Sequence, residues 1–366
     1  MITYLFCFGT RPEVIKMAPV IHEIESRGFD PKICVTGQHR EMLDQMLRVF
    51  GLHPDFDLNL MTANQTLNSL AASIFSNIDE VFKTLNPDVV LIQGDTTTAS
   101  IVAQAAFHNQ IRVAHIEAGL RTYHRYSPFP EEINRQVISR IASYHFTPTD
   151  RATENLRNEG IEEDTILQTG NTVVDSLKLV EKSFEKQEKE MKLKLNLSDI
   201  NKLILVTGHR RENFGNGIEE LCKALLELAK QPFVHIIFPV HLNPRTKQIV
   251  EERLNGIANI ELLSPVNYTE MIWLMKNCDL IISDSGGIQE EAPAFKKPVI
   301  VTREFTERQE AVDAGFSFLT GTNSEEILMH AIRLIKSPPD LKNKLNPFGD
   351  GHASERIVNY LIQRLA

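Results

Sequence analysis

Short apolar segments alternate with longer segments of helical periodicity along this chain of 366 residues. The apolar segments are rich in β-branched residues and bounded by turns, which predicts strands buried on both faces. In the first half we predict strands at residues 4–8, 32–36, 89–93, 113–116 and 144–147, and helices at 14–27, 41–50, 67–85, 97–107 and 132–143. This alternation predicts an α/β fold, in which helices cover both faces of a doubly wound parallel sheet.

The second half repeats the pattern, and the length of the chain also favours two domains. Its predicted strands are 203–207, 234–239, 260–263, 280–283, 299–302 and 316–319, and its predicted helices are 218–230, 245–254, 270–276, 288–294 and 325–335. A segment rich in Lys and Glu, residues 177–201, fits a solvated helix and connection. We place the boundary after residue 172, and a last predicted helix, 355–365, could pack on either domain.

Composition excludes several classes of function. The net charge is −9 and basic residues are interspersed with acidic ones, which argues against nucleic acids and anionic membrane surfaces as partners. No apolar run approaches the ~20 residues of a membrane helix, and the first residues lack the basic start of a secretory signal. We therefore expect a cytoplasmic protein.

Cysteine and histidine patterns give no sign of a metal site. The four cysteines, Cys7, Cys34, Cys222 and Cys278, form no CxxC pair, so we expect buried, unpaired thiols. The twelve histidines include no HExxH motif. We predict that the protein binds no metal.

Polar residues gather where predicted strands end, and ligands of doubly wound sheets bind at that edge. After the first strand, Gly9 allows a tight turn, and Arg11 and Lys16 bring two cations close to a helix N-terminus, which favours anions. The alternative is an ordinary capped turn. After the strand at 89–93, Asp95 either caps the next helix or points toward a ligand.

Two glutamates in the first half are candidates for proton transfer. Glu117 ends an apolar strand, where a buried carboxylate is costly; it either forms an ion pair with Arg121 or serves chemistry. Glu131 stands at the start of a predicted helix, where it either complements the helix dipole or joins Glu117 in catalysis.

The second half carries the strongest anion site. Ser285, Gly286 and Gly287 follow a strand and open a helix, so backbone N–H groups there could bind a diphosphate. Glu291 could accept ribose hydroxyls, and Arg308 could add a cation. A further turn at residues 208–213 holds His209 beside Arg210, Arg211 and Glu212. Together with the carboxylates of the first half, these residues suit a nucleotide-sugar in an interdomain cleft.

The motifs at these strand ends resemble those of the non-hydrolysing UDP-N-acetylglucosamine 2-epimerases. The resemblance runs in order from Gly9 to Gly351 through GTRPEVIKMAP, TGQHREMLDQ, GDTTT, HIEAGLRT, SPFPEEINR, GHRRENFG, PVHLNP, SDSGGIQEEAP, TER and NPFGDG. It implies the GT-B architecture of two Rossmann-like domains with an interdomain cleft, residues 1–172 and 173–352. It also implies that a terminal helix within 353–366 crosses back to the first domain.

The resemblance further implies an isomerase that interconverts UDP-GlcNAc and UDP-ManNAc for surface polysaccharides, as a homodimer and without a nicotinamide cofactor. The residues that match its catalytic set are Asp95, Glu117, Glu131 and His209. Those that match its UDP contacts are Arg11, Lys16, Ser285, Gly286, Gly287, Glu291 and Arg308, with Met271 where the family has an aromatic residue under the uracil. Those that match a second, activating UDP-GlcNAc site are Gln38, Arg210 and His241.

Some positions depart from the family pattern. Gln309 replaces the Pro that usually follows TER, and Glu41 and Asn64 stand where some members carry Gln and Arg. The alternatives that the residues leave open are a hydrolysing epimerase that releases UDP and ManNAc, a 2-epimerase of another UDP amino sugar, a GT-B glycosyltransferase and a nucleotide-sugar-binding regulator.

Overall fold

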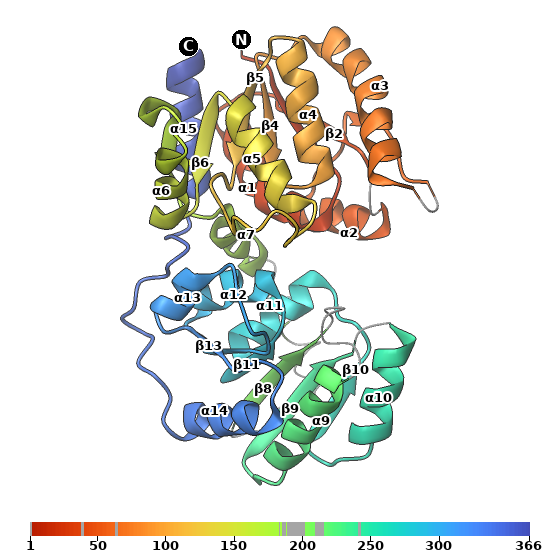
Figure 1. Cartoon of the computed structure of the whole chain (residues 1–366), viewed down its shortest axis with the longest axis vertical. Coiled ribbons are helices and arrows are strands. Elements are labelled where there is room, and N and C mark those ends of the chain that lie inside the picture. The colour runs from red at the N-terminus through yellow and green to blue at the C-terminus, as the bar shows by residue number, and fades with distance from the viewer. Residues whose placement is uncertain are drawn as a thin grey trace. The chain divides into compact units, whose positions relative to one another are not determined.

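The computed structural model describes residues 2–37, 40–62, 65–182, 184, 188, 202–208, 216–240 and 243–366. The chain folds into two compact units, Met1–Leu179 with Phe348–Ala366 and Val180–Pro347, which we call the first and second unit. Each unit is a parallel sheet between helices (Figure 1), so the predicted α/β class is confirmed.

The sheet of the first unit has the strand order β3-β2-β1-β4-β5-β6-β7, and every strand pair is parallel. Its strands are β1 (Tyr4–Phe8), β2 (Lys32–Val35), β3 (Phe56–Asp57), β4 (Val89–Gln93), β5 (Arg112–Ile116), β6 (Tyr144–Thr147) and β7 (Ile166–Gln168). The strand order reverses between β1 and β4, so connections leave these two strands in opposite directions. In sheets of this kind, ligands bind outside the carboxyl ends of the strands at such a reversal.

Helices cover both faces of this sheet. They are α1 (Arg11–Ser26), α2 (Arg40–Phe50), α3 (Leu67–Leu85), α4 (Thr97–His108), α5 (Glu131–Ile141), α6 (Asp150–Asn158), α7 (Thr172–Glu181) and α15 (Ala353–Leu365). Helix α1 packs against α2 and α15, while α4 packs against α3 and α5. The central strands β1 and β4 are wholly buried between these two layers, as their uninterrupted apolar sequences require.

The sheet of the second unit has the order β10-β9-β8-β11-β12-β13 and is also parallel. Its strands are β8 (Lys202–Thr207), β9 (Val234–Pro239), β10 (Ile260–Leu263), β11 (Leu280–Ser283), β12 (Val299–Val301) and β13 (Ser317–Leu319). Its helices are α9 (Asn216–Ala229), α10 (Pro244–Leu254), α11 (Tyr268–Asn277), α12 (Gly286–Glu291), α13 (Gln309–Asp313) and α14 (Ser324–Lys336). The order reverses between β8 and β11.

Several helices begin at a side chain that caps them. The Thr66, Thr96 and Thr149 hydroxyls accept a hydrogen bond from the first turn of α3, α4 and α6. Helix α11 begins with a capping box, in which Asn267 and Glu270 each bond the backbone of the other. These caps satisfy N–H groups that have no partner within the helix, so they fix where each helix starts.

The last helix packs on the first unit. The Asp175 carboxylate accepts hydrogen bonds from the Ala353 and Ser354 backbone N–H groups, at 3.2 and 2.9 Å, and so binds the N-terminus of α15. The Tyr360 ring of α15 lies edge-on to Tyr144 and Phe146. Asp175 belongs to α7, and the boundary predicted after residue 172 falls just inside this helix.

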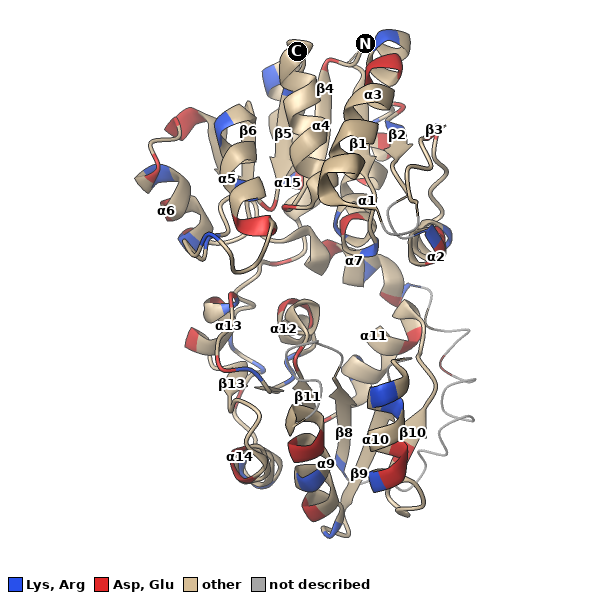
Figure 2. Cartoon of the chain, turned by 45° about the vertical axis from the view of Figure 1, so that its right-hand side comes forward, with Lys and Arg blue, Asp and Glu red and all other residues tan. Residues whose placement is uncertain are grey.

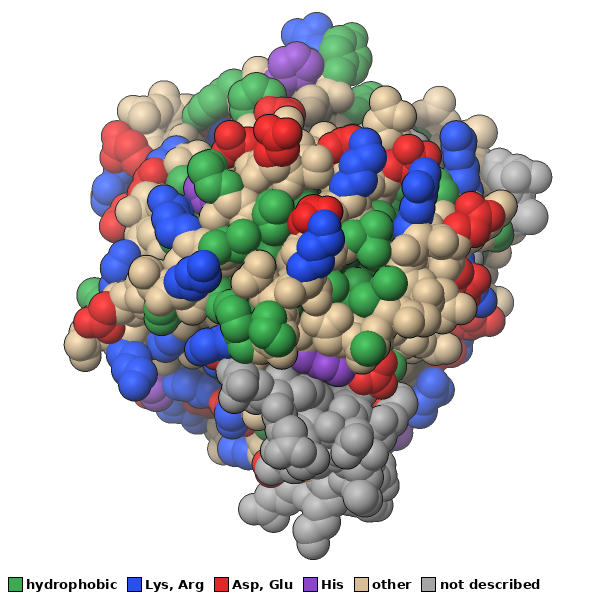
Figure 3. All heavy atoms as spheres, turned by 90° about the horizontal axis from the view of Figure 1, so that it is seen from below, with side chains coloured by type: hydrophobic (Ala, Val, Ile, Leu, Met, Phe, Trp, Pro, Cys, Tyr) green, Lys and Arg blue, Asp and Glu red, His purple; other side chains and the backbone are tan. Residues whose placement is uncertain are grey.

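Charged side chains of both signs are interspersed over the surface helices, as α9 and α10 illustrate in Figure 2. In the view from below, apolar side chains lie among charged ones (Figure 3). Within the described part of the chain, we find no helix with the length and apolarity of a bilayer span.

All four cysteines are buried and unpaired, which confirms the prediction. Burial raises the pKa of Cys222 and of Cys278 to about 12. Thiols with such pKa values stay protonated near neutral pH, so these two behave as small apolar side chains.

Gly119 lies where only glycine fits. Its φ is +87°, and a Cβ there would lie 2.2 Å from the carbonyl oxygen of Ala152. Gly160 also has a positive φ, +75°, but nothing lies within 4 Å of its Cβ position. We expect Gly160→Ala to cost about 1 kcal/mol of unfolding free energy through backbone conformation alone.

For Gly119→Ala we expect about 3 kcal/mol, because the backbone at residue 152 has to move as well. Differential scanning calorimetry of both variants tests this. Equal losses of thermal stability would show that the first unit absorbs the contact without cost.

Candidate active site

The carboxyl ends of β1, β4 and β5 lie side by side, since these strands are neighbours in the first sheet. The turns that follow them hold predicted site residues: Arg11 after β1, Asp95 after β4 and Glu117 after β5. The structure therefore brings together residues that are far apart in sequence, at the position where the strand order reverses.

The turn after β1 is closed by a residue that the sequence analysis did not single out. The Glu13 carboxylate accepts hydrogen bonds from the Gly9 and Thr10 N–H groups, at 3.0 and 2.8 Å, and from the Thr10 hydroxyl at 2.8 Å. Its other oxygen accepts from the Thr96 hydroxyl at 2.8 Å, which ties this turn to the one after β4. The Thr-x-x-Glu spacing of a capping box was the available signal.

Glu13 is 1% exposed, and Arg11 beside it is exposed. Burial raises the pKa of Glu13, although hydrogen bonds from Gly9, Thr10 and Thr96 oppose this rise. The capped turn that we considered as an alternative is therefore present. It leaves the guanidinium of Arg11 available at the surface.

Glu117 is buried in a strained backbone conformation. Its φ is +64°, a left-handed value that is costly for a residue with a Cβ. Lys16 lies 2.5 Å from Oε1, Asn171 donates to Oε1 at 3.2 Å, and Gln93 donates to Oε2. Strain of this kind persists only where the surroundings hold it, and it is concentrated at functional sites.

The alternative of an ion pair between Glu117 and Arg121 is wrong. The Arg121 guanidinium instead binds both carboxylate oxygens of Glu159, at 2.7 and 2.8 Å, and the Ser139 hydroxyl at 2.9 Å. Arg121 lies beyond the end of the strand and points toward α5 and α6. The carboxylate of Glu117 is thus paired with Lys16 from α1.

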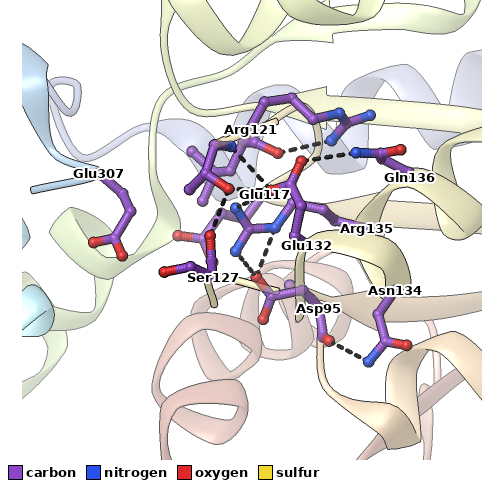
Figure 4. Close-up of polar contacts among 12 residues, drawn as sticks. Asp95, Glu117, Arg121, Ser127, Glu132, Asn134, Arg135, Gln136 and Glu307 are labelled. Carbon is purple, nitrogen blue, oxygen red and sulfur yellow. Dashed lines mark hydrogen bonds and ion pairs between the residues drawn. The ribbon is translucent and has the colours of Figure 1, made fainter. Parts of the chain in front are cut away.

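Asp95 does not cap helix α4, because the Thr96 side chain does so. Its carboxylate receives the Arg135 guanidinium at 3.0 and 2.5 Å, and its carbonyl accepts from Asn134 at 2.9 Å (Figure 4). Arg135 also lies 3.3 Å from Glu132. Helix α5 therefore fixes the position of Asp95, and Arg135 was missed by the sequence analysis.

The adjacent glutamates at the start of α5 differ in their surroundings. Burial, and then the negative charge of Asp95, raise the pKa of Glu131. Burial would also raise the pKa of Glu132, but hydrogen bonds from Thr122 and Gln136 and the charge of Arg135 bring it below its usual value. Of the two, Glu131 is the better candidate for proton transfer, because its pKa is raised while the partners of Glu132 hold that carboxylate ionised.

His115 supports the turn that carries Asp95. Its Nε2 lies 2.7 Å from the carbonyl oxygen of Gly94, and because a carbonyl only accepts, Nε2 carries the proton. Burial lowers the pKa of His115 to about 3, so the ring is neutral. The neutral His115 ring therefore donates a hydrogen bond to the Gly94 carbonyl and holds this turn in place.

In the second unit, the predicted anion site lies at the carboxyl end of β11. Ser285 is the N-cap of α12, without a side-chain bond to the helix, and Gly286 and Gly287 follow it. A Cβ on Gly286 would lie 3.1 Å from the guanidinium carbon of Arg308. Glycine thus lets Arg308 lie against the start of α12, as the anion-site prediction requires.

Two carboxylates hold Arg308 there. Glu290 accepts from its Nε at 2.8 Å, and Glu307 accepts from its Nη1 at 3.1 Å. Burial opposes ionisation of Glu307, but the charges of Arg308 and Arg303 lower its pKa to about 2. The carboxylates fix the guanidinium and reduce the charge that it offers to an anion.

The remaining predicted contacts of the second unit lie nearby. Glu291 is 7% exposed and accepts a hydrogen bond from the Tyr268 hydroxyl at 3.0 Å. Met271 lies one turn after Tyr268 in α11 and is partly exposed.

Some predicted residues lie outside the described ranges. These are His209 of the catalytic set and Gln38, Arg210 and His241 of the second-site set, together with Asn64. Their roles stay predictions. Among the residues that the structure does describe, no three His, Cys, Asp or Glu side chains are grouped as metal ligands.

Comparison with known proteins extends over nearly the whole chain. Residues 22–362 match the sequence model of the family described as UDP-N-acetylglucosamine 2-epimerase. The UDP-N-acetylglucosamine 2-epimerase of Campylobacter jejuni is 46% identical over 98% of this chain and 97% of its own length. That of Escherichia coli K12 is 45% identical over the same shares.

Solved structures agree. The UDP-GlcNAc 2-epimerase of Neisseria meningitidis, solved with UDP-GlcNAc bound, has a TM-score of 0.91 at 44% identity and covers 99% of this chain and 100% of its own. The Methanocaldococcus jannaschii enzyme, solved with UDP-GlcNAc and UDP, has a TM-score of 0.83 at 36% identity, over 99% and 100% of the two chains. A glycosyltransferase of kitacinnamycin shares the fold alone, with a TM-score of 0.65 at 11% identity over 99% and 98%.

The predicted GT-B class of two Rossmann-like domains is thereby confirmed. The family model covers residues 22–362, and the Campylobacter jejuni enzyme aligns with 98% of this chain. We conclude that this chain belongs to the UDP-N-acetylglucosamine 2-epimerase family.

Proposed function

We propose that this protein inverts C2 of UDP-GlcNAc to give UDP-ManNAc, reversibly and without net hydrolysis. The observation that carries the proposal is Glu117: a buried, strained carboxylate held by side chains from three other parts of the first unit. Such a carboxylate is costly for stability and suits a proton-transfer role. Relatives solved with UDP-GlcNAc bound support the choice of substrate.

The chemistry explains why several carboxylates are needed. The C2 proton of this sugar is not adjacent to a carbonyl, so it is not acidic enough for direct removal. We propose that UDP leaves C1 as the C2 proton is taken, which gives a glycal, and that UDP returns while a proton is delivered to the opposite face. Two groups must therefore exchange protons at C2, on its two faces.

We assign these transfers to Asp95 and Glu117, which follow the neighbouring strands β4 and β5, and to Glu131, which begins α5 and is close enough for the charge of Asp95 to raise its pKa. His209 and Arg11 would stabilise the departing diphosphate. UDP would be bound by Lys16, Met271, Ser285, Gly286, Gly287, Glu291 and Arg308. In the structure Lys16 forms an ion pair with Glu117. Lys16 would therefore interact both with the Glu117 carboxylate and with UDP.

The remaining parts of the proposal come from the resemblance. They are a homodimer, activation by a second UDP-GlcNAc, supply of surface polysaccharide precursors, and catalysis by the side chains without a bound cofactor. Location in the cytoplasm also stays a prediction.

Proton NMR of the purified protein with UDP-GlcNAc in D2O tests the function. We expect UDP-ManNAc to form with deuterium at C2, and UDP to stay far below the amount of sugar converted. Boiled protein is the control. UDP and free ManNAc in equal amounts would instead identify a hydrolysing epimerase.

Other results of this experiment would indicate a different substrate or a different function. Absence of C2 exchange with UDP-GlcNAc, but exchange with another UDP amino sugar, would change the substrate and keep the reaction. Absence of exchange with every such sugar, together with tight UDP binding, would favour a transferase or a binding protein. The glycosyltransferase that shares the fold makes the transferase the first of these to test.

A further inference from the structure

Asn171 connects β7 to α7 and uses all its polar groups. Its side-chain oxygen accepts from the Val173 N–H at 3.0 Å, and its side-chain nitrogen donates to Glu117 Oε1 at 3.2 Å. A backbone N–H only donates, so the amide oxygen has to face Val173 and the NH2 group has to face Glu117. The residue is 4% exposed, which leaves the amide no alternative partner in water.

The C-terminal segment fixes the backbone of Asn171. The Asn171 N–H donates to the carbonyl of Phe348 at 2.8 Å. Gly170 and Gly349 pass so closely that a Cβ on Gly349 would lie 3.1 Å from the Gly170 Cα. Both glycines have positive φ values, +91° and +113°. The segment that returns to the first unit therefore crosses directly over the turn that carries Asn171.

Further bonds fasten this segment on either side of the crossing. Lys178 donates to the carbonyls of Asp350 and Gly351, each at 2.9 Å, and Arg356 donates to the carbonyl of Thr169 at 3.0 Å. Asp175 binds the start of α15. Lys178 and Asp175 bind the same C-terminal segment as Asn171, but none of these bonds goes to Glu117. A variant at Lys178 can therefore be compared with variants at Asn171.

We infer that Asn171 is a positioning residue for Glu117, and that the C-terminal segment around Phe348 and Gly349 holds it in that role. Lys16 and Asn171 both bind Oε1, while Gln93 binds Oε2, so the carboxylate is oriented from two sides. This inference rests on the proposed catalytic role of Glu117. It assigns a function to the NPFGDG motif, which the proposed reaction does not otherwise use.

Substitution by aspartate distinguishes positioning from a structural role. In Asn171→Asp one oxygen still accepts from Val173, but the other faces the Glu117 carboxylate, and two such groups repel each other. We expect kcat for C2 exchange to fall about 100-fold in Asn171→Asp and about 10-fold in Asn171→Ala, with little change in KM for UDP-GlcNAc. A purely structural role predicts the opposite order, because aspartate keeps the shape and the bond to Val173.

Lys178→Met is the control. It removes two hydrogen bonds to the same segment, so we expect a lower melting temperature and the wild-type kcat. If Asn171→Asp does not fold, Asn171→Ala compared with Lys178→Met carries the test. Wild-type kcat in a folded Asn171→Ala, or equal kcat losses in Asn171→Ala and Lys178→Met, would overturn the inference.

The outcomes also separate this inference from the proposed function. Wild-type protein that exchanges C2, with Asn171 variants that exchange it equally fast, overturns the role of Asn171 and keeps the function. Wild-type protein that does not exchange C2 of UDP-GlcNAc overturns the proposed function and the role of Asn171 with it.

Discussion

Replacement of Glu117 by glutamine is expected to lower the rate of C2 deuterium exchange by about 10³- to 10⁴-fold. The amide has nearly the shape of the carboxylate but cannot take up or release a proton in the reaction. It also presents an NH2 group where the carboxylate accepts hydrogen bonds from Lys16, Gln93 and Asn171. The ammonium group of Lys16 can only donate, and the Asn171 side-chain oxygen already accepts from Val173. The glutamine therefore keeps one acceptor in place of two, and its NH2 group finds an acceptor only if the Gln93 amide turns.

The same substitution removes the carboxylate that pairs with Lys16, a residue that is 8% exposed. Loss of a short ion pair in a buried site lowers stability, so the melting temperature should fall as well. Glu159→Gln provides the matched control, because Glu159 pairs with the buried side chain of Arg121 in the same unit. We expect the control to lose stability and to keep the wild-type rate of exchange.

Exchange is measured by proton NMR in D2O, and folding by circular dichroism and calorimetry. A folded Glu117→Gln protein that exchanges C2 at the wild-type rate would remove Glu117 from the catalytic set. The strain at its backbone would then need another explanation.

The parts of the fold that depend on apolar runs of four or more residues could be predicted from the sequence. Strands β1, β4, β6, β9, β10 and β11 have the predicted ends, because each is an apolar segment that stops at a polar turn. The short edge strands β3 and β7 were missed, since two or three residues leave no pattern to detect. Helices α6, which is largely polar, and α13, which has five residues, were missed for similar reasons.

The positions of the site turns could be predicted, but their contacts could not. Sequence proximity favoured Arg121 as the partner of Glu117, yet the chain turns after β5 and takes Arg121 to Glu159. The partners that do bind Glu117 are Lys16 of α1, Gln93 of β4 and Asn171 before α7, which are distant in sequence and cannot be found by spacing. These contacts depend on the order of the strands in the sheet, and no single sequence motif predicts that order.

Asp95→Asn is expected to lower the rate of exchange by about 10²- to 10³-fold and to shift its pH dependence. The loss of rate follows from removal of a carboxylate that Arg135 holds at the end of β4. The shift follows from electrostatics: the charge of Asp95 is one cause of the raised pKa of Glu131, after burial. Without that charge the Glu131 carboxylate is easier to form, so its pKa falls.

The direction of this shift is the same whichever role Glu131 has. If Glu131 acts as the base, the acidic limb of the pH profile for C2 exchange belongs to it and should move to lower pH. If it acts as the acid, the alkaline limb belongs to it and should also move to lower pH. The limb that moves therefore shows which role Glu131 has in the measured direction of the reaction.

Two variants complete the experiment. Glu131→Gln should abolish the limb that moves, which confirms its assignment. Asp150→Asn makes the same change of charge in the first unit, at a residue that is not among the causes of the Glu131 shift, and should leave the profile unchanged. If the Asp95→Asn profile also stays where it is, burial alone raises the pKa of Glu131, and Asp95 affects the rate through its own carboxylate.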